Sequence, residues 1–202
     1  MHHRTGHLSS AGRALTTRAK AFLLALALLA SPLALADGPN LWVEASVQRP
    51  QEGTGITETL AWIDGPIGGP IGWFVFAYQD SDGYREIYGG PTVKPLPWLE
   101  LGVGIGRENE GNRHRRSAHF SADGEIGSIS GYFENGASGP SHKLYLNYWL
   151  RNSLGIGLME DHSGRGPRMV LRFSEKANLW GALLRQNADG STRALAAVNY
   201  QF

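Results

Sequence analysis

The stretch Leu99–Gly106 reads LELGVGIG. Its odd-numbered residues are leucine, leucine, valine and isoleucine, whereas its even-numbered residues are one glutamate and three glycines. Side chains at successive positions of a β-strand point to opposite faces of the sheet. The stretch therefore predicts a strand with one apolar face and one face that is polar or free of side chains.

The same alternation recurs to the last residue of the chain, and no helical period of 3.6 residues persists anywhere. Clear examples are 143–150, 168–173 and 193–202. Turn residues separate the alternating runs. We predict twelve strands, at roughly 41–49, 55–64, 71–79, 84–94, 98–108, 114–122, 125–134, 142–150, 153–161, 167–174, 179–186 and 191–202.

The connections between these strands alternate in character. One kind is polar and glycine-rich, as in QDSDG and EDHSGRGP, and the other is mostly shorter, as in KPLP and RNS. Long loops at one end, short turns at the other and strands of about ten residues are typical of a transmembrane barrel. We predict an all-β fold, an antiparallel up-and-down transmembrane β-barrel of about 12 strands. Ten strands are the alternative if ADGE or GPIGGP lies inside a bent strand, and eight would need longer loops than the sequence offers.

The first part of the chain predicts export. Residues 21–36 read AFLLALALLASPLALA, follow a stretch whose only Asp, Glu, Lys or Arg residues are basic, and end in a small-x-small triplet. We predict a cleaved signal peptide over 1–36 and one barrel domain over 37–202. The latter holds 15 Lys and Arg against 18 Asp and Glu, so no basic surplus indicates nucleic acid. The chain has no cysteine, which excludes disulfides and thiol catalysis.

The last nine residues read ALAAVNYQF and place Val198, Tyr200 and Phe202 on one strand face. This terminus, with the export segment and the strand pattern, resembles bacterial outer-membrane β-barrel proteins. The resemblance implies the outer membrane of a Gram-negative bacterium, with lipid and lipopolysaccharide around the barrel. It also implies that the barrel-assembly machinery recognises Val198, Tyr200 and Phe202.

All six tryptophans fall near the end of the predicted barrel that has the shorter connections, which is the periplasmic end in this topology. Aromatic side chains gather where a membrane meets water. We therefore predict an interfacial belt of Trp42, Trp62, Trp73, Trp98, Trp149 and Trp180.

One short motif has catalytic character. His119 and Ser121 lie two residues apart and so on one strand face, where a histidine could activate a serine. His119-Phe120-Ser121 resembles the His-aromatic-Ser motif of outer-membrane lipid A 3-O-deacylases. However, Ala122-Asp123-Gly124 follows where that family has an asparagine-containing continuation. His119 and Ser121 are thus weak catalytic candidates, and the leading interpretation is a polar pair in the lumen.

The other histidines after residue 36 lie in separate polar connections and lack the spacing of metal ligands. We predict neither a metal site nor a cofactor. Charged residues on the polar strand faces are expected to line a hydrated or ion-paired lumen, because isolated charges in a dry interior are costly. These are Glu44, Glu86, Glu100, Lys143, Arg168, Arg172, Arg185 and Arg193.

Within this set we expect Glu100 and Arg172 to lie almost across the lumen from each other, near its periplasmic end, with Glu44 between them. Opposed charges of this kind discriminate between ions. The leading functional prediction is a non-enzymatic narrow channel or a structural protein of the envelope. The alternatives are an outer-membrane hydrolase of lipid A or phospholipid, and a soluble periplasmic or secreted β-sandwich that binds a ligand.

Overall fold

The computed structural model describes residues 39–51, 54–111 and 114–202. The signal peptide predicted over 1–36 lies outside these residues. No helix in the described part of the chain is long and apolar enough to cross a membrane.

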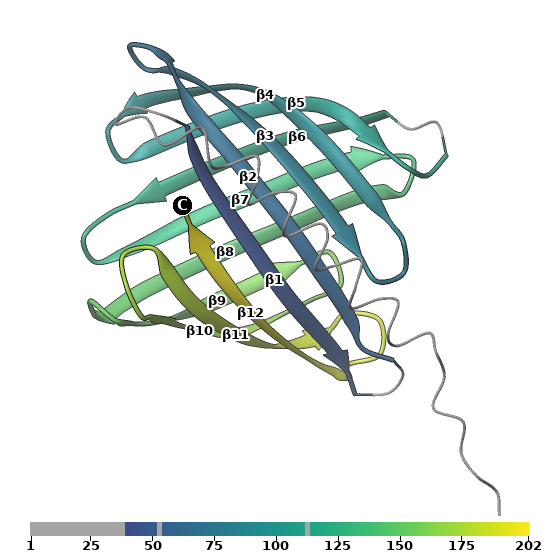
Figure 1. The fold of residues 1–202 in the computed structure, drawn as a ribbon. Coiled ribbons are helices and arrows are strands. Elements are labelled where there is room, and N and C mark those ends of the chain that lie inside the picture. Colours follow the sequence, from purple (N-terminus) through teal and green to yellow (C-terminus); the bar gives the residue numbers. More distant parts are fainter. Residues whose placement is uncertain (1–38, 52–53, 112–113) are drawn as a thin grey trace, which may run out of the picture. The chain divides into compact units, whose positions relative to one another are not determined.

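The described chain is a closed antiparallel barrel in which each strand pairs with its neighbours in sequence (Figure 1). Pairing of the first strand with the last closes the ring. The strands are β1 (Asn40–Pro50), β2 (Ile56–Gly68), β3 (Ile71–Asp80), β4 (Arg85–Leu96), β5 (Leu99–Glu108), β6 (His114–Asp123), β7 (Gly127–Gly136), β8 (Gly139–Arg151), β9 (Leu154–Asp161), β10 (Gly164–Arg172), β11 (Ala177–Gln186) and β12 (Thr192–Gln201).

The fold class and the count of twelve strands are therefore confirmed. The connections are shorter than predicted, because many of their residues continue the strands. GPIGGP is mostly the end of β2, where a register shift lies between Pro66 and Gly68. Gly69 then turns the chain with a positive φ of 56°, a conformation that glycine adopts readily. The start of β1, the end of β12 and this turn lie at one end of the barrel, which is called the terminal end below. The opposite end is called the loop end.

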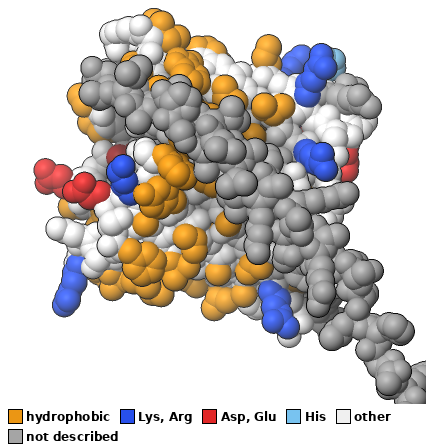
Figure 2. Space-filling view, in the orientation of Figure 1, with side chains coloured by type: hydrophobic (Ala, Val, Ile, Leu, Met, Phe, Trp, Pro, Cys, Tyr) orange, Lys and Arg blue, Asp and Glu red, His pale blue; other side chains and the backbone are white. Residues whose placement is uncertain are grey.

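The outer face of the barrel is apolar. Ile105 is 77% exposed, Leu158 58% and Val198 54%, and each alternates with an inward residue on its strand. Figure 2 shows hydrophobic side chains spread over the visible wall, with most visible charged side chains toward the two ends. So large an exposed apolar surface is unusual for a soluble protein and is the surface that a barrel presents to lipid.

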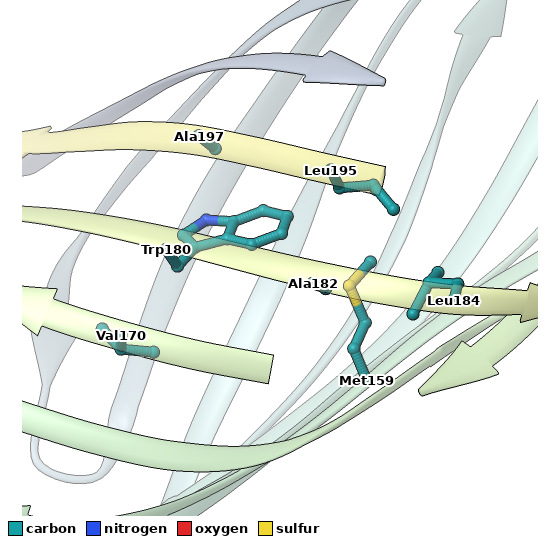
Figure 3. Packing of buried hydrophobic residues seen from close by; sticks show 7 residues of the cluster. All are labelled: Met159, Val170, Trp180, Ala182, Leu184, Leu195 and Ala197. Carbon is teal, nitrogen blue, oxygen red and sulfur yellow. The ribbon is translucent and has the colours of Figure 1, made fainter. Parts of the chain in front are cut away.

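The inner face carries two apolar clusters. One contains Met159 of β9, Val170 of β10 and Trp180 of β11, with Ala182, Leu184, Leu195 and Ala197 around them. Figure 3 shows the indole of Trp180 between Val170 on one side and Leu195 and Ala197 on the other. The second cluster contains Leu60, Phe74, Phe76 and Tyr88. These clusters line parts of the inner wall, so the interior is neither a uniform polar pore nor a filled core.

The glycines of β5 make room for the second cluster. A Cβ atom on Gly102 would lie 2.0 Å from Cε1 of His119, and one on Gly104 would lie 2.9 Å from Cζ of Phe74. Both contacts are too close for a side chain. The glycine face of the stretch LELGVGIG is therefore the surface on which the rings of His119 and Phe74 lie inside the barrel.

Candidate functional site: the barrel lumen

A cavity of about 1410 Å³ occupies the interior, and all twelve strands contribute to its wall. Asn152 and Glu175 line it at the terminal end, and Asp82 and Glu110 line it at the loop end. The cavity therefore reaches the connections at both ends of the barrel. Twelve strands leave more interior than side chains fill, since about eight already give a barrel that side chains can close.

Acidic side chains predominate in this cavity. Among the described residues, twelve Asp or Glu side chains line it, against five Lys or Arg side chains. The acidic residues are Glu44, Glu58, Asp64, Asp80, Asp82, Glu86, Glu100, Glu110, Asp123, Glu134, Asp161 and Glu175. The basic residues are Arg115, Lys143, Arg168, Arg172 and Arg193. A passage lined in this way attracts cations and repels anions.

One arginine neutralises part of this acid. Arg115 of β6 forms ion pairs of 2.5 Å with Glu86, 2.9 Å with Glu108 and 2.5 Å with Glu134. The side chains of Arg115 and Glu108 are 3% and 0% exposed. These four residues, called the Arg115 cluster, join β4, β5, β6 and β7 across the interior near the loop end.

Hydroxyl groups complete the Arg115 cluster. The hydroxyl of Tyr84 lies 2.7 Å from a carboxylate oxygen of Glu86 and 2.8 Å from one of Glu108, so it can donate its one proton to either. Ser138, in the connection between β7 and β8, donates its hydroxyl to Glu108 at 2.6 Å and accepts one from Arg115 at 2.9 Å. The buried charges are thus both paired and hydrogen-bonded, which is the condition for tolerating them in a low-dielectric environment.

Aromatic rings cross the lumen nearer the terminal end. Trp62 of β2 stacks on Phe74 with ring centroids 4.6 Å apart, and it meets His119 at 4.8 Å and Tyr132 of β7 at 5.9 Å. Because β2 and β7 are five strands apart, these contacts close the part of the lumen along β3 to β6. Glu44 of β1, Tyr145 of β8 and Arg168 of β10 also line the cavity.

Two acid–base pairs line the cavity without a direct ion pair, and in each an aromatic side chain contacts both partners. In the first, the indole of Trp180 donates a hydrogen bond of 2.7 Å to Glu44. The guanidinium carbon of Arg168 lies 4.8 Å from the centroid of the same ring and 4.8 Å from that of Tyr145. Asn147 accepts a hydrogen bond of 2.5 Å from Arg168.

In the second pair, Tyr78 of β3 donates a hydrogen bond of 2.6 Å to Glu58. Nζ of Lys143, on β8, lies 5.8 Å from the centroid of the Tyr78 ring. Ser46 and Gln48 also donate hydrogen bonds to Glu58. Since β3 and β8 are five strands apart, Lys143 reaches across the lumen. The pairs Glu44–Arg168 and Glu58–Lys143 are called the separated pairs below.

Of the charged residues predicted to line the lumen, the structure places seven along the cavity: Glu44, Glu86, Glu100, Lys143, Arg168, Arg172 and Arg193. For Arg185 the prediction is wrong. It is exposed, follows the buried Leu184 and shares the outward face of β11 with Leu183. A long side chain near a strand end can keep its charge in water from an outward position, so its polarity is no sign of an inward direction.

The predicted belt of six tryptophans is also wrong for four of them. Trp42 and Trp62 line the cavity, Trp180 belongs to the inner apolar cluster, and Trp149 packs against that cluster. Only Trp73, which alternates with inward residues on β3, and Trp98, which is 53% exposed in a turn, remain outside. Trp62 stacks on Phe74, and Trp149 and Trp180 lie against arginines, which stabilises these rings inside the barrel. Trp42 packs against the second apolar cluster.

Glu100 and Arg172, which were predicted to oppose each other across the lumen, each have other partners. Glu100 forms an ion pair of 3.1 Å with Lys94 and lies 3.5 Å from Nε2 of His119. Arg172 lies over the ring of Trp149 at 3.5 Å. Each residue is thus engaged near its own wall, and the separated pairs supply the opposed charges instead. Glu58, which the sequence analysis missed, lies on the same face of β2 as Leu60 and Trp62, and this spacing of two residues could have revealed it.

The weak catalytic candidates do not form a nucleophile–base pair. Ser121 donates its hydroxyl to Asp123 at 2.8 Å, whereas His119 lies between aromatic rings and beside Glu100. Among the described residues, no group of three or more His, Asp or Glu side chains is arranged to hold a metal ion. Val198, Tyr200 and Phe202 lie exposed on one face at the terminal end.

No protein-family model matches the chain, and no curated protein sequence matches it. Solved porin structures do resemble it. The KdgM porin has a TM-score of 0.56 at 10% identity, over 80% of this chain and 99% of that chain. KdgM in complex with disordered oligogalacturonate gives 0.54 at 9% identity, over 81% and 99%. The NanC porin gives 0.50 at 10% identity, over 79% and 98%. At this identity the likeness establishes the fold, which is that of these porins.

Proposed function

We propose that the protein is a non-enzymatic channel of the outer membrane of a Gram-negative bacterium, which lets small hydrophilic solutes diffuse through and favours cations. The observation that carries this proposal is the acid-rich cavity of about 1410 Å³ that reaches the connections at both ends of the barrel. A purely structural barrel would have no need of such a cavity.

The outer surface supports the location. Its apolar side chains suit hydrocarbon, and a closed barrel leaves no strand edge unpaired, which is what a lipid bilayer requires of a β-structure. The porin fold is consistent with the same place. The lumen differs from what a polyanion such as the oligogalacturonate bound by KdgM would need, because carboxylates outnumber basic groups along it.

Export by the signal peptide over 1–36, contact with lipopolysaccharide and recognition of Val198, Tyr200 and Phe202 by the barrel-assembly machinery belong to the same proposal. Phe202→Ala should lower the amount of protein in the outer membrane more than Phe133→Ala does. Both rings are exposed, with 51% and 44% of their area, so loss of an outward ring is matched in the two variants. Equal membrane levels would contradict a role of Phe202 in assembly.

The channel function is tested by swelling of liposomes that contain the folded protein. We expect swelling in isotonic solutions of small sugars and amines, and a decrease in rate as solute size increases. The matched control is the same amount of heat-unfolded protein, identified by its changed migration in gel electrophoresis. Liposomes that swell no faster with the folded barrel than with the control would show that the lumen is closed.

A further inference from the structure

The separated pairs have a geometry that an ordinary ion pair does not have. Trp180 touches both Glu44 and Arg168, and Tyr78 touches Glu58 and lies under Lys143. In the described part of the chain, neither Lys143 nor Arg168 forms an ion pair within 4.0 Å. The same arrangement of acid, ring and cation thus occurs twice in one passage.

The charges nevertheless act on one another. Glu44 interacts electrostatically with both Lys143 and Arg168, and Lys143 interacts with both Glu58 and Glu44. The two acids lie on the adjacent strands β1 and β2, whereas the two cations lie on β8 and β10. One wall of the passage is therefore negative and the facing wall positive, with a gap between them.

Tyr132 and Tyr145 line this gap on the cationic wall, with ring centroids 6.3 Å apart. A solute in the gap would meet a carboxylate at one side, an ammonium or guanidinium at the other and aromatic rings along its length. A single cation would be attracted to Glu44 and Glu58 but repelled by Lys143 and Arg168. A single anion would be attracted to Lys143 and Arg168 but repelled by Glu44 and Glu58, and by the excess of acidic side chains along the lumen.

We propose that the separated pairs form a binding site for small zwitterions, of which α-amino acids are the chemical class that fits. The ammonium group of such a solute would bind at Glu44 and Glu58, and its carboxylate at Lys143 and Arg168. Because the partners stand beyond direct contact, the solute completes two charge-assisted hydrogen bonds without first breaking an ion pair. This inference deepens the proposed function and rests on it.

Three probes of similar shape test the inference: L-phenylalanine, phenylalaninamide and N-acetylphenylalanine, which at about pH 6 are a zwitterion, a cation and an anion. Each is added to the channel in a planar bilayer, and the concentration that halves the KCl current is measured. We expect the zwitterion to act at a concentration about tenfold lower than either other probe. Equal blocking by all three, or strongest blocking by the amide, would overturn the inference while the current itself upholds the channel.

Two variants test which charged group of the solute binds at which side chain. Lys143→Met should raise the blocking concentration of phenylalanine about tenfold. It should not raise that of the amide, which has no carboxylate and is repelled by Lys143. Glu58→Gln should weaken phenylalanine and the amide but not the N-acetyl compound. Lys176→Met is the matched control, because Lys176 is exposed and does not line the cavity.

The wild-type ranking decides the inference even if a variant fails to insert. Lys143→Arg, which keeps the charge, should retain the preference for the zwitterion. A wild-type protein that carries no current at all would instead refute the proposed channel, a different failure from a channel that does not discriminate among the probes.

Discussion

The Arg115 cluster and the separated pairs use the same residue types in opposite ways. In the Arg115 cluster one guanidinium touches three carboxylates at 2.5–2.9 Å, near the loop end. In the separated pairs each carboxylate and its cation contact the same aromatic ring but not each other. Charges in contact hold strands together, whereas charges held apart leave a field that a solute can use.

The two regions also differ in what they contribute to the barrel wall. The Arg115 cluster links β4 to β7 through the interior and is capped by Tyr84 and Ser138. In the separated pairs, Trp180 belongs to the apolar cluster that contains Ala182 and Leu195, and Tyr78 packs against the second apolar cluster. The Arg115 cluster therefore links strands through ion pairs, whereas the separated pairs are held by aromatic side chains and border the cavity.

The largest effect is expected from Arg115→Met. It leaves the carboxylates of Glu86, Glu108 and Glu134 without their cation, and breaking a buried pair in this way costs about 3–5 kcal/mol. The free energy of unfolding in lipid vesicles, from urea titration, measures it. Arg185→Met is the control, because Arg185 is exposed on the outer face. Similar free energies of unfolding for the two variants would show that the Arg115 cluster does not stabilise the barrel.

A smaller loss is expected from Trp180→Phe, which keeps a ring in the apolar cluster but removes the hydrogen bond to Glu44. Leaving that buried acceptor without its donor should cost about 1–3 kcal/mol. The urea titration used for Arg115→Met measures this loss. Trp98→Phe supplies the control, since Trp98 lies exposed in a turn. A stability equal to that of the control would mean that Glu44 does not depend on the indole.

The smallest loss of stability is expected from Arg168→Met. Arg168 has no carboxylate in contact, so the change removes cation–π contacts with Tyr145 and Trp180, worth about 1–2 kcal/mol when desolvated. The same change should move ion selectivity further toward cations, because it deletes a positive charge from the passage. A loss of stability as large as that of Arg115→Met would contradict the distinction between charges in contact and charges held apart.

Local alternation predicted the fold well, because a barrel strand has one face toward lipid and one toward the lumen along its whole length. LELGVGIG and the alternation over 143–150 each identify a strand and show which of its residues share the apolar face. The loops were harder. The segment Glu108–Arg116 is charged and resembles a surface loop, yet Glu108 ends β5 and Arg115 lies buried in β6. A charge that finds its partners on other strands looks the same in sequence as a solvated one.

The tryptophans show the same limit. Their positions along the strands gave their place near the terminal end, but not whether each ring points to lipid or to the lumen. Trp180 points inward because Glu44 accepts its N–H and Arg168 lies over its ring, contacts that join β1, β10 and β11. Such long-range pairing, which also defines the separated pairs, is fixed by closure of the barrel and by register, and neither can be read from one strand.

The reversal potential of the wild-type channel across a KCl gradient tests the central claim most directly. The account predicts a measurable current whose reversal potential has the sign of a potassium-preferring channel, because twelve carboxylates face five basic side chains along the described lumen. The preference should fall as salt rises and screens these charges. A reversal potential of the opposite sign, or a correctly folded barrel that carries no current, would contradict it.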